Sequence, residues 1–163
     1  MIPGEAGRRS SDAVADRKTW NSSEGKPGMD GIEVGMTGTA ELVVEEAHTA
    51  PRIGSGRIHV LGTPVMINLM EAAALAAVEH RLAEGHQSLG IHLDVSHVAA
   101  TPVGMRVHAV AEVTEVAGNK IAFRVEARDE LDLIGEGAHR RVVVEVARFD
   151  KRVQKKRDAR AQV

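Results

Sequence analysis

The pattern of apolar and polar positions divides the chain into one long apolar helix and several strand-like stretches. Residues 39–44 are typical of a strand, and residues 45–62 form a loop with Gly, Pro and His. A threonine followed by Pro64 suits the start of a helix, because threonine is a good N-cap and proline is favoured at the first helical position. We expect this helix to run to about Ala83, with Gly85 ending it. It is apolar on nearly all sides at first, which is typical of a buried helix.

Four further strand-like stretches follow, separated by turn residues at hairpin-like spacing. They cover residues 90–98, 106–116, 120–129 and 137–149. A strand, a long buried helix and then antiparallel strands predict an α+β architecture, with the sheet curled around the helix. A parallel nucleotide-binding fold would need alternating strands and helices. One curled sheet leaves a side of the helix open, so we expect a partner chain.

The two ends of the chain differ from its middle in composition. Residues 1–30 are rich in Gly, Ser, Asp, Arg and Lys and hold few apolar residues, so we expect a disordered N-terminal tail. Residues 31–150 have the length and composition of one domain with a core. Residues 151–163 are basic and polar, and we expect a solvated C-terminal tail there.

Composition removes several classes of function. Aromatic residues are only 2% of the 163 residues, namely Trp20, Phe123 and Phe149, so the core must be aliphatic. Stacking platforms for single-stranded nucleic acid are therefore nearly missing. The net charge of −2 creates no field that attracts a polyanion, and we expect no nucleic-acid partner. The absence of cysteine removes disulfides, thiolate zinc sites and thiol nucleophiles, and fits a reducing compartment.

The sequence also contains no segment typical of a membrane span or a secretory signal. None of its apolar stretches reaches membrane-spanning length. The N-terminal region lacks the apolar core of a secretory signal. We therefore expect a cytoplasmic protein without a membrane partner.

A carboxylate in the apolar helix is the first candidate for chemistry. Residues 65–78 hold only two polar side chains, Asn68 and Glu71. A buried, unpaired carboxylate costs several kcal/mol, so Glu71 must find partners, take up a proton or line a cavity. Groups of this kind are often functional. Asn68 lies about one turn earlier and is either a polar contact in the same cavity or an interface amide.

A histidine on a strand is the second candidate. Alternation places His97 on one strand face together with Ile91, Leu93 and Val95. A single histidine on an apolar face is more often a hydrogen-bonded core residue. Glu71 on the facing helix changes this interpretation, because a carboxylate near an imidazole can activate water or stabilise an imidazolium.

Thr63 and an arginine complete the candidates. Thr63 is either a structural N-cap or a hydroxyl that positions or attacks a substrate carbonyl beside the free N–H groups of the helix N-terminus. Arg140 and Arg141 point to opposite faces of the last strand, so at most one faces the pocket. The eight histidines form no HExxH motif and no compact cluster, so we expect no metal site and no cofactor.

Six segments occur in an order and spacing that resemble the fluoroacetyl-CoA thioesterase-like family of hotdog-fold proteins. They are TPVMINLME (63–71), SLG (88–90), VSH (95–97), ATPVG (100–104), IGEGAHRR (134–141) and FDKRV (149–153). The likeness spans about residues 31–156. It implies a hotdog fold and hydrolysis of an acyl-CoA thioester. It also implies a homodimer with the active site at the subunit interface, and whether dimers pair into a tetramer stays open.

The resemblance implies roles for five residues. Thr63, Glu71 and His97 correspond to the family's catalytic set, while Gly90 and Arg141 correspond to residues implicated in binding the thioester substrate. Glu71 would act as general base on water or as nucleophile. Thr63 would orient it or the carbonyl, and His97 would stabilise developing charge or protonate the leaving thiolate.

One segment departs from the family pattern. The fluoroacetyl-specific enzyme has phenylalanines in the loop before the helix, where they act as a lid. Here residues 51–60 hold no aromatic residue. We therefore do not expect specificity for fluoroacetyl-CoA, but we still expect thioester hydrolysis. The alternatives are a non-catalytic acyl-CoA or small-ligand binding protein and a hotdog dehydratase or hydratase, whose typical His/Asp placement is absent. Nucleic-acid binding through residues 151–160 is a further alternative.

Overall fold

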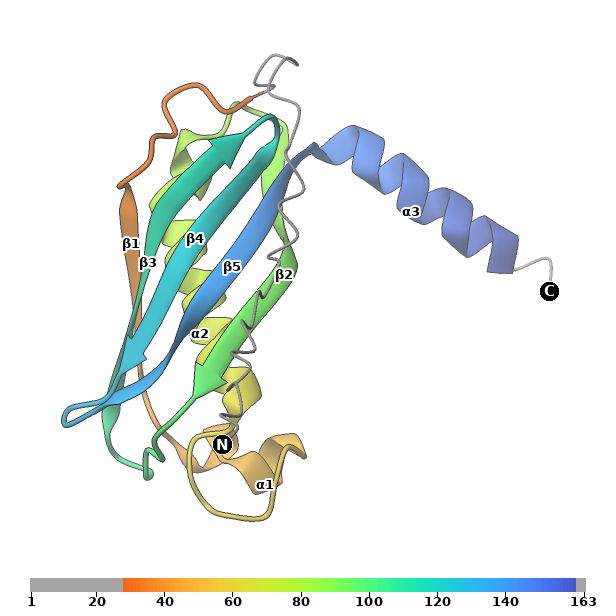
Figure 1. Cartoon of the computed structure of the whole chain (residues 1–163). Helices are drawn as coiled ribbons and strands as arrows, with labels where there is room; N and C mark the ends of the chain where they lie inside the picture. The colour runs from red at the N-terminus through yellow and green to blue at the C-terminus, as the bar shows by residue number, and fades with distance from the viewer. Residues whose placement is uncertain (1–27, 161–163) are drawn as a thin grey trace, which may run out of the picture.

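A five-stranded antiparallel sheet forms the body of the protein, in a computed structural model that describes residues 28–160 (Figure 1). The strand order is β1-β3-β4-β5-β2. The strands are β1 (Thr37–Val43), β2 (His86–His97), β3 (Arg106–Ala117), β4 (Lys120–Arg128) and β5 (Leu133–Glu145). The sheet curls around one long helix, α2 (Thr63–Val78), which runs along its concave face. The predicted α+β architecture is therefore confirmed.

Helix α2 packs mainly on β1 and β3, through the buried residues Met66, Leu69, Met70, Ala73, Ala74, Ala77 and Val78. Its contact with β1 is unusually close. A Cβ atom at Gly38 would collide with the backbone of Ala73 and Ala77, so only glycine fits there. On the opposite side of α2, Asn68 and Ala76 are exposed. The helix thus has an uncovered side.

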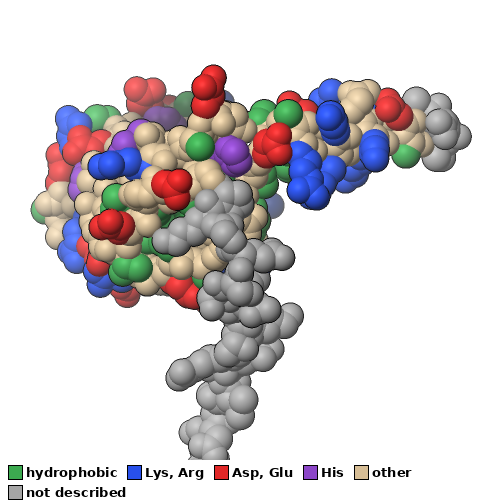
Figure 2. Space-filling view, turned by 90° about the horizontal axis from the view of Figure 1, so that it is seen from above, with side chains coloured by type: hydrophobic (Ala, Val, Ile, Leu, Met, Phe, Trp, Pro, Cys, Tyr) green, Lys and Arg blue, Asp and Glu red, His purple; other side chains and the backbone are tan. Residues whose placement is uncertain are grey.

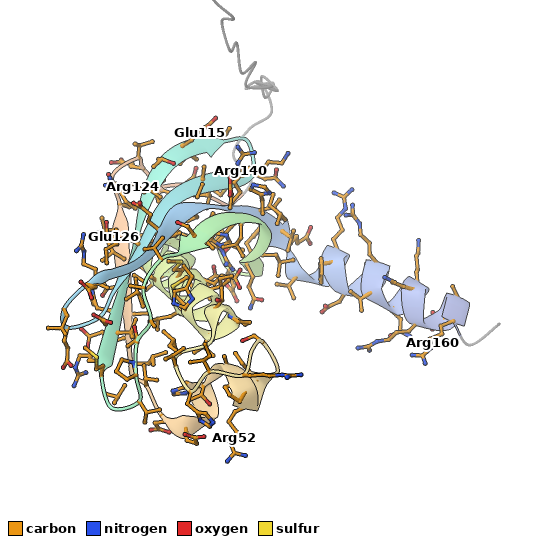
Figure 3. The ribbon with its side chains drawn as sticks, turned by 60° about the horizontal axis from the view of Figure 1, so that its bottom comes forward. Arg52, Glu115, Arg124, Glu126, Arg140 and Arg160 are labelled. Carbon is orange, nitrogen blue, oxygen red and sulfur yellow. The ribbon has the colours of Figure 1, made fainter. Side chains whose placement is uncertain are left out.

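The core between helix and sheet is aliphatic, as the composition predicts. Strands β3 and β4 alternate between buried and more exposed positions, and their buried residues are Val107, Ala109, Ala111, Val113, Ile121, Phe123, Val125 and Ala127. Phe123 is the single aromatic ring in the core cluster of the described residues. Charged pairs such as Arg124–Glu112, at 2.6 Å, lie on the outer face of the sheet, where Figure 3 labels Arg124, Glu126 and Arg140.

The helix and the histidine strand differ from expectation at their ends. Helix α2 ends at Val78, and a 3₁₀ turn, η2 (Glu79–Arg81), takes the place of the predicted last turns. Strand β2 begins at His86, four residues earlier than predicted, and carries an irregularity between Gly90 and His92. This bulge turns Ile91 outward, where it is 50% exposed. Placing Ile91 on the helix-facing side was therefore wrong.

The loop before α2 is partly helical. It contains η1 (Glu46–His48) and the four-residue α1 (Ala50–Ile53), which Gly54 ends in the left-handed conformation at φ 76°. A bridge between Thr49 and Leu61 closes the loop at its base.

The last strand ends earlier than predicted. Strand β5 stops at Glu145, and α3 (Val146–Arg160) follows directly as a basic helix that projects from the body (Figures 1 and 2). The prediction that the strand runs to residue 149 was wrong, because α3 begins at Val146. Residues 151–160, part of the predicted basic tail, are helical and mostly exposed. The predicted disordered segment falls almost wholly on residues 1–27, outside the described residues.

Candidate active site

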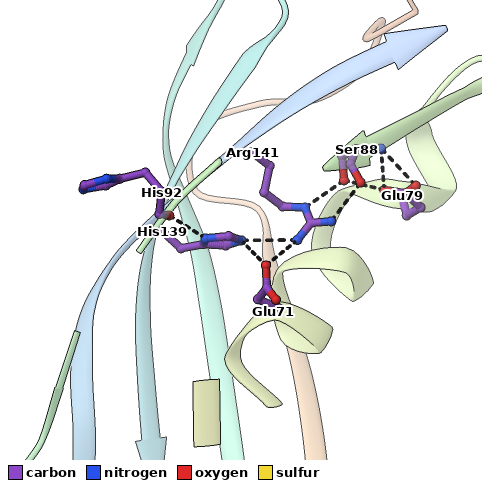
Figure 4. A network of polar contacts seen from close by, with 6 residues as sticks. All are labelled: Glu71, Glu79, Ser88, His92, His139 and Arg141. Atoms are coloured by element: carbon purple, nitrogen blue, oxygen red, sulfur yellow. Dashed lines mark hydrogen bonds and ion pairs between the residues drawn. The ribbon is translucent and has the colours of Figure 1, made fainter. Parts of the chain in front are cut away.

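Glu71 lies on α2 and takes part in a network of polar contacts that meet at Arg141 (Figure 4). Its Oε1 atom is 3.5 Å from Nη1 of Arg141 and 3.7 Å from Nε2 of His139. The side chain is 33% exposed, so the carboxylate has partners on one side and access to solvent on the other. A paired carboxylate with open access can still accept a proton or contact a substrate.

Arg141 is buried and held by Ser88 of the neighbouring strand. Its Nε donates to Ser88 Oγ and its Nη2 to Ser88 O, each at 2.8 Å. Ser88 Oγ in turn donates to Oε2 of Glu79 at 2.6 Å. Burial lowers the pKa of Arg141, while the carboxylates of Glu71 and Glu79 oppose this effect. The guanidinium remains a cation and is fixed on the side of Glu71.

His139 supports the same cluster from a fully buried position on β5. Its Nδ1 lies 2.9 Å from the His92 carbonyl, to which it must donate. Nε2 is then the acceptor for Arg141 Nη1, at 3.2 Å. Burial lowers the pKa of His139, which agrees with a neutral ring. The ring also stacks on Phe123 with centroids 5.9 Å apart.

Gly90 provides the space in which the Glu71 carboxylate lies. A Cβ atom at this position would collide with Glu71 Oε1 and would come within 3.2 Å of His139 Cε1. Glycine is needed here because the carboxylate packs directly over the backbone of β2.

Thr63 and His97 form a second polar pair at the start of α2. Thr63 Oγ1 and His97 Nδ1 are 2.8 Å apart. Gly62 is the N-cap, and Thr63 is the first helical residue with no side-chain capping bond, so the structural N-cap role considered for Thr63 is wrong. The Nε2 atom of His97 is buried and has no hydrogen-bond partner within residues 28–160. Burial lowers the pKa of His97, against a weaker opposing contact with the Ala99 backbone.

A cavity of about 390 Å³ lies beside this pair. Its lining includes Thr63 and His97, together with aliphatic residues and the side chain of Arg57. The volume falls within the usual range for small-ligand pockets. The loop that forms one wall contributes the aliphatic side chains of Ile58 and Val60 and holds no aromatic residue.

Comparison with known proteins identifies the chain. A family model described as fluoroacetyl-CoA-specific thioesterase, FlK, matches residues 44–147. The chain belongs to this family. The fluoroacetyl-CoA thioesterase of Streptantibioticus cattleyicolor is 35% identical over 136 residues, which cover 80% of this chain and 98% of that protein.

Solved structures of two relatives agree with this assignment. A threonine-to-serine variant of FlK in complex with acetyl-CoA is 34% identical, with a TM-score of 0.73 over 77% of this chain and 98% of that chain. A thioesterase superfamily member from Thermus thermophilus is 31% identical, with a TM-score of 0.78 over 83% of this chain and all of that chain. The predicted hotdog fold and thioesterase class are thereby confirmed.

The predicted residues of this thioesterase fall into two clusters rather than one. Glu71, Gly90 and Arg141 meet, and Thr63 meets His97. Thr63 and Glu71 are eight residues apart on α2, which is about 12 Å along a helix axis. The expected contact between Glu71 and His97 is therefore absent within one chain. Asn68 is exposed and makes no hydrogen bond with the described residues, so it joins neither cluster.

Three residues of the Arg141 cluster were missed as site residues. They are His139, Ser88 and Glu79. Strand parity could have found His139, because it lies two residues before Arg141 and so shares its face, while Arg140 points outward. Ser88 and Glu79 meet only because β2 turns back along the end of α2. No local sequence pattern indicates this tertiary contact.

The described residues hold neither a metal-binding cluster nor a helix that could span a membrane. Within residues 28–160, no group of three or more His, Asp or Glu side chains is placed to hold a metal ion. The helices of the same part of the chain are all too short or too polar to cross a membrane.

Proposed function

We propose that this thioesterase hydrolyses an acyl-CoA at a site shared by two protomers, with Thr63 and His97 of one chain facing Glu71 of the other. The observation that carries the proposal is the setting of Glu71. Its carboxylate is oriented over Gly90 by Arg141, whose Nη1 also donates to His139, yet it remains partly accessible. A base or nucleophile needs this combination of fixed orientation and access.

The unpaired edge of the sheet supports a homodimer. Strand β2 has twelve residues and lies at the edge of the sheet, where β5 is its one partner among the described strands. The hydrophobic side chains of Ile91 and Val98 are exposed on it or just after it. An exposed strand edge with apolar residues is a pairing surface.

The proposed reaction begins at the thioester carbonyl. Glu71 takes a proton from water as the water oxygen bonds to the carbonyl carbon. The carbon–sulfur bond then breaks, and the CoA thiolate takes up the proton held by Glu71 as the acid is released. If the carboxylate itself attacks, loss of the thiolate leaves an acyl anhydride on Glu71, which a water molecule hydrolyses to the free acid while the water's proton passes to the thiolate. Arg141 holds the Glu71 carboxylate in place throughout, and His139 fixes Arg141 by accepting from its Nη1.

Thr63 and His97 are proposed to act on the oxygen of the carbonyl. Because burial lowers the pKa of His97, the ring is neutral near pH 7 and acts as a hydrogen-bonding group rather than as a cation. The first turn of α2 offers few free backbone N–H groups to the carbonyl oxygen. Pro64 has no N–H, and the N–H groups of Val65 and Met66 both donate to Gly62 O. The N–H of Thr63 is the remaining backbone donor of this turn.

We infer that the acyl group occupies the cavity beside Thr63 and His97. The cavity wall lacks the aromatic side chains of a fluoroacetyl-specific lid, and Ile58 is 74% exposed at the same loop. An acyl group other than fluoroacetyl therefore fits the proposal better.

A hydrolysis screen over short, long, branched and aromatic acyl-CoAs tests the proposal. Glu71→Gln keeps the shape of the side chain but removes its basicity, and it should lower kcat/KM at least about a hundredfold. Glu84→Gln, on the exposed turn before β2, is the matched control and should retain activity. Acyl-CoA binding by calorimetry without turnover of any thioester would instead support a binding protein.

A further inference from the structure

A second hollow, of about 210 Å³, lies where β5 passes into α3. Its polar and aromatic lining consists of His86, Asn119, Glu145, Arg148, Phe149 and Arg152. The hollow is smaller than a typical small-molecule site, so it has room for only part of a larger ligand.

The lining combines an exposed aromatic ring with two cations. Phe149 is 37% exposed, whereas Phe123, the other aromatic ring of the described residues, is buried in the core. Arg148 and Arg152 are four residues apart on α3 and therefore lie on one face of the helix. Neither forms an ion pair within residues 28–160, and both are exposed.

A nucleotide matches this combination of groups. Aromatic rings stack on nucleobases, and guanidinium groups bind phosphates with two parallel hydrogen bonds. The carboxylate of Glu145 leaves the hollow with net positive charge, because it opposes two arginines. We infer that this hollow binds the 3′-phosphorylated ADP end of coenzyme A, an inference that rests on the proposed function.

The distance from the hollow to the Glu71 cluster fits the same ligand. Arg141 and Glu145 are four residues apart on β5, and Val143 and Glu145 share the strand parity of Arg141. Four extended residues span about 14 Å. The pantetheine arm joins the pyrophosphate oxygen to the sulfur through about twelve bonds, as many as the backbone of four residues, and thus extends to about the same length. A nucleotide in the hollow therefore lets the thioester reach Gly90 and Glu71.

The rest of α3 offers a matched control. The helix carries seven Lys or Arg residues against two Asp, and Figure 2 shows cationic side chains along its projecting length. Arg157 and Arg160 lie beyond the hollow, and Arg160 is labelled at the far end in Figure 3. Reversing their charge alters the net charge of α3 as much as reversing Arg148 and Arg152 does.

The experiment compares two double variants, Arg148→Glu with Arg152→Glu and Arg157→Glu with Arg160→Glu. Each is assayed with an acyl-CoA and with the same acyl group on N-acetylcysteamine, which lacks the nucleotide. The first pair should raise KM for the acyl-CoA about tenfold and weaken inhibition by adenosine 3′,5′-bisphosphate to a similar extent. It should leave kcat/KM for the short thioester unchanged. The second pair should change KM by less than about twofold.

Two results would overturn the inference. Equal effects of the two double variants on KM would show that α3 attracts anions only through its net charge and not through the hollow. Binding of a single-stranded oligonucleotide that both pairs weaken, with bisphosphate binding unaltered, would point to nucleic acid. Calorimetry can compare the binding of adenosine 3′,5′-bisphosphate to the unchanged protein and to Phe149→Ala, which we expect to bind it more weakly. This measurement tests the hollow even if the protein hydrolyses no thioester. The inference and the proposed function can thus fail separately.

Discussion

The carboxylate of Glu71 occupies the space over the backbone of Gly90 that any side chain at that position would fill. Glycine at residue 90 is thus a requirement for the position of the acid. This contact joins α2 to the edge strand β2. It gives Gly90 a role in positioning Glu71 that does not require Gly90 to touch the substrate.

Substitution Gly90→Ala should lower kcat/KM roughly tenfold to a hundredfold, because displacing a catalytic group by about 1 Å has effects of this size. Steady-state kinetics on the best acyl-CoA measures it. The double variant with Glu71→Gln should be no slower than Glu71→Gln alone, since Gly90 acts through the carboxylate. Additive losses would show that Gly90 has an independent role.

Mixing inactive variants tests the shared site. A chain with Thr63→Ala and a chain with Glu71→Gln should each be nearly inactive. After the two are unfolded together and refolded at equal concentration, half of the dimers carry one intact site of two, so about a quarter of wild-type activity should return. No recovery would show that all three residues act within one protomer.

Ser88 should contribute to stability through Arg141 and Glu79. Ser88→Ala removes the hydrogen bonds of its hydroxyl to both side chains. We expect the free energy of unfolding to fall by about 1–3 kcal/mol, the cost of leaving buried charged groups less well paired. Urea denaturation measures it. Ser96→Ala on the same strand, where the hydroxyl is exposed, should cost less than about 0.5 kcal/mol.

Stability should also depend on the protonation of the buried histidines. Burial lowers the pKa of His139 and of His97 below 6.5, so the unfolded chain binds protons more readily than the folded one. Their contribution to stability is therefore full above the unfolded pKa and is lost as pH falls through the lower folded pKa. Denaturation midpoints from pH 7.5 to pH 5 should decrease. His139→Gln should flatten this slope, while His59→Gln on the exposed loop should not.

Gly38 should be intolerant of any side chain. Gly38→Ala places a methyl group against the backbone of α2, and we expect overpacking to cost about 1–3 kcal/mol in unfolding free energy. Thr39→Ala is the matched control, because this neighbouring side chain is exposed. Equal losses for the two variants would contradict the close approach of β1 and α2.

Much of the fold followed from local patterns. The apolar run around Glu71 predicted a buried helix, and the alternating stretches predicted antiparallel strands, because each pattern reflects the face that must leave water. The ends of elements were less predictable. The bulge after Gly90 and the passage of β5 directly into α3 at Val146 depend on strand register and packing, which short-range sequence does not encode.

The architecture, the family and five residues of the two polar clusters were predictable from the sequence, whereas Ser88 and Glu79 were not. The tertiary structure sets which of these residues meet. It paired Glu71 with Arg141 and His139, and it paired His97 with Thr63, about 12 Å away along the helix. The physical reason is that periodicity defines the face of a residue but not its position along the facing element, which the strand register and the packing of α2 determine.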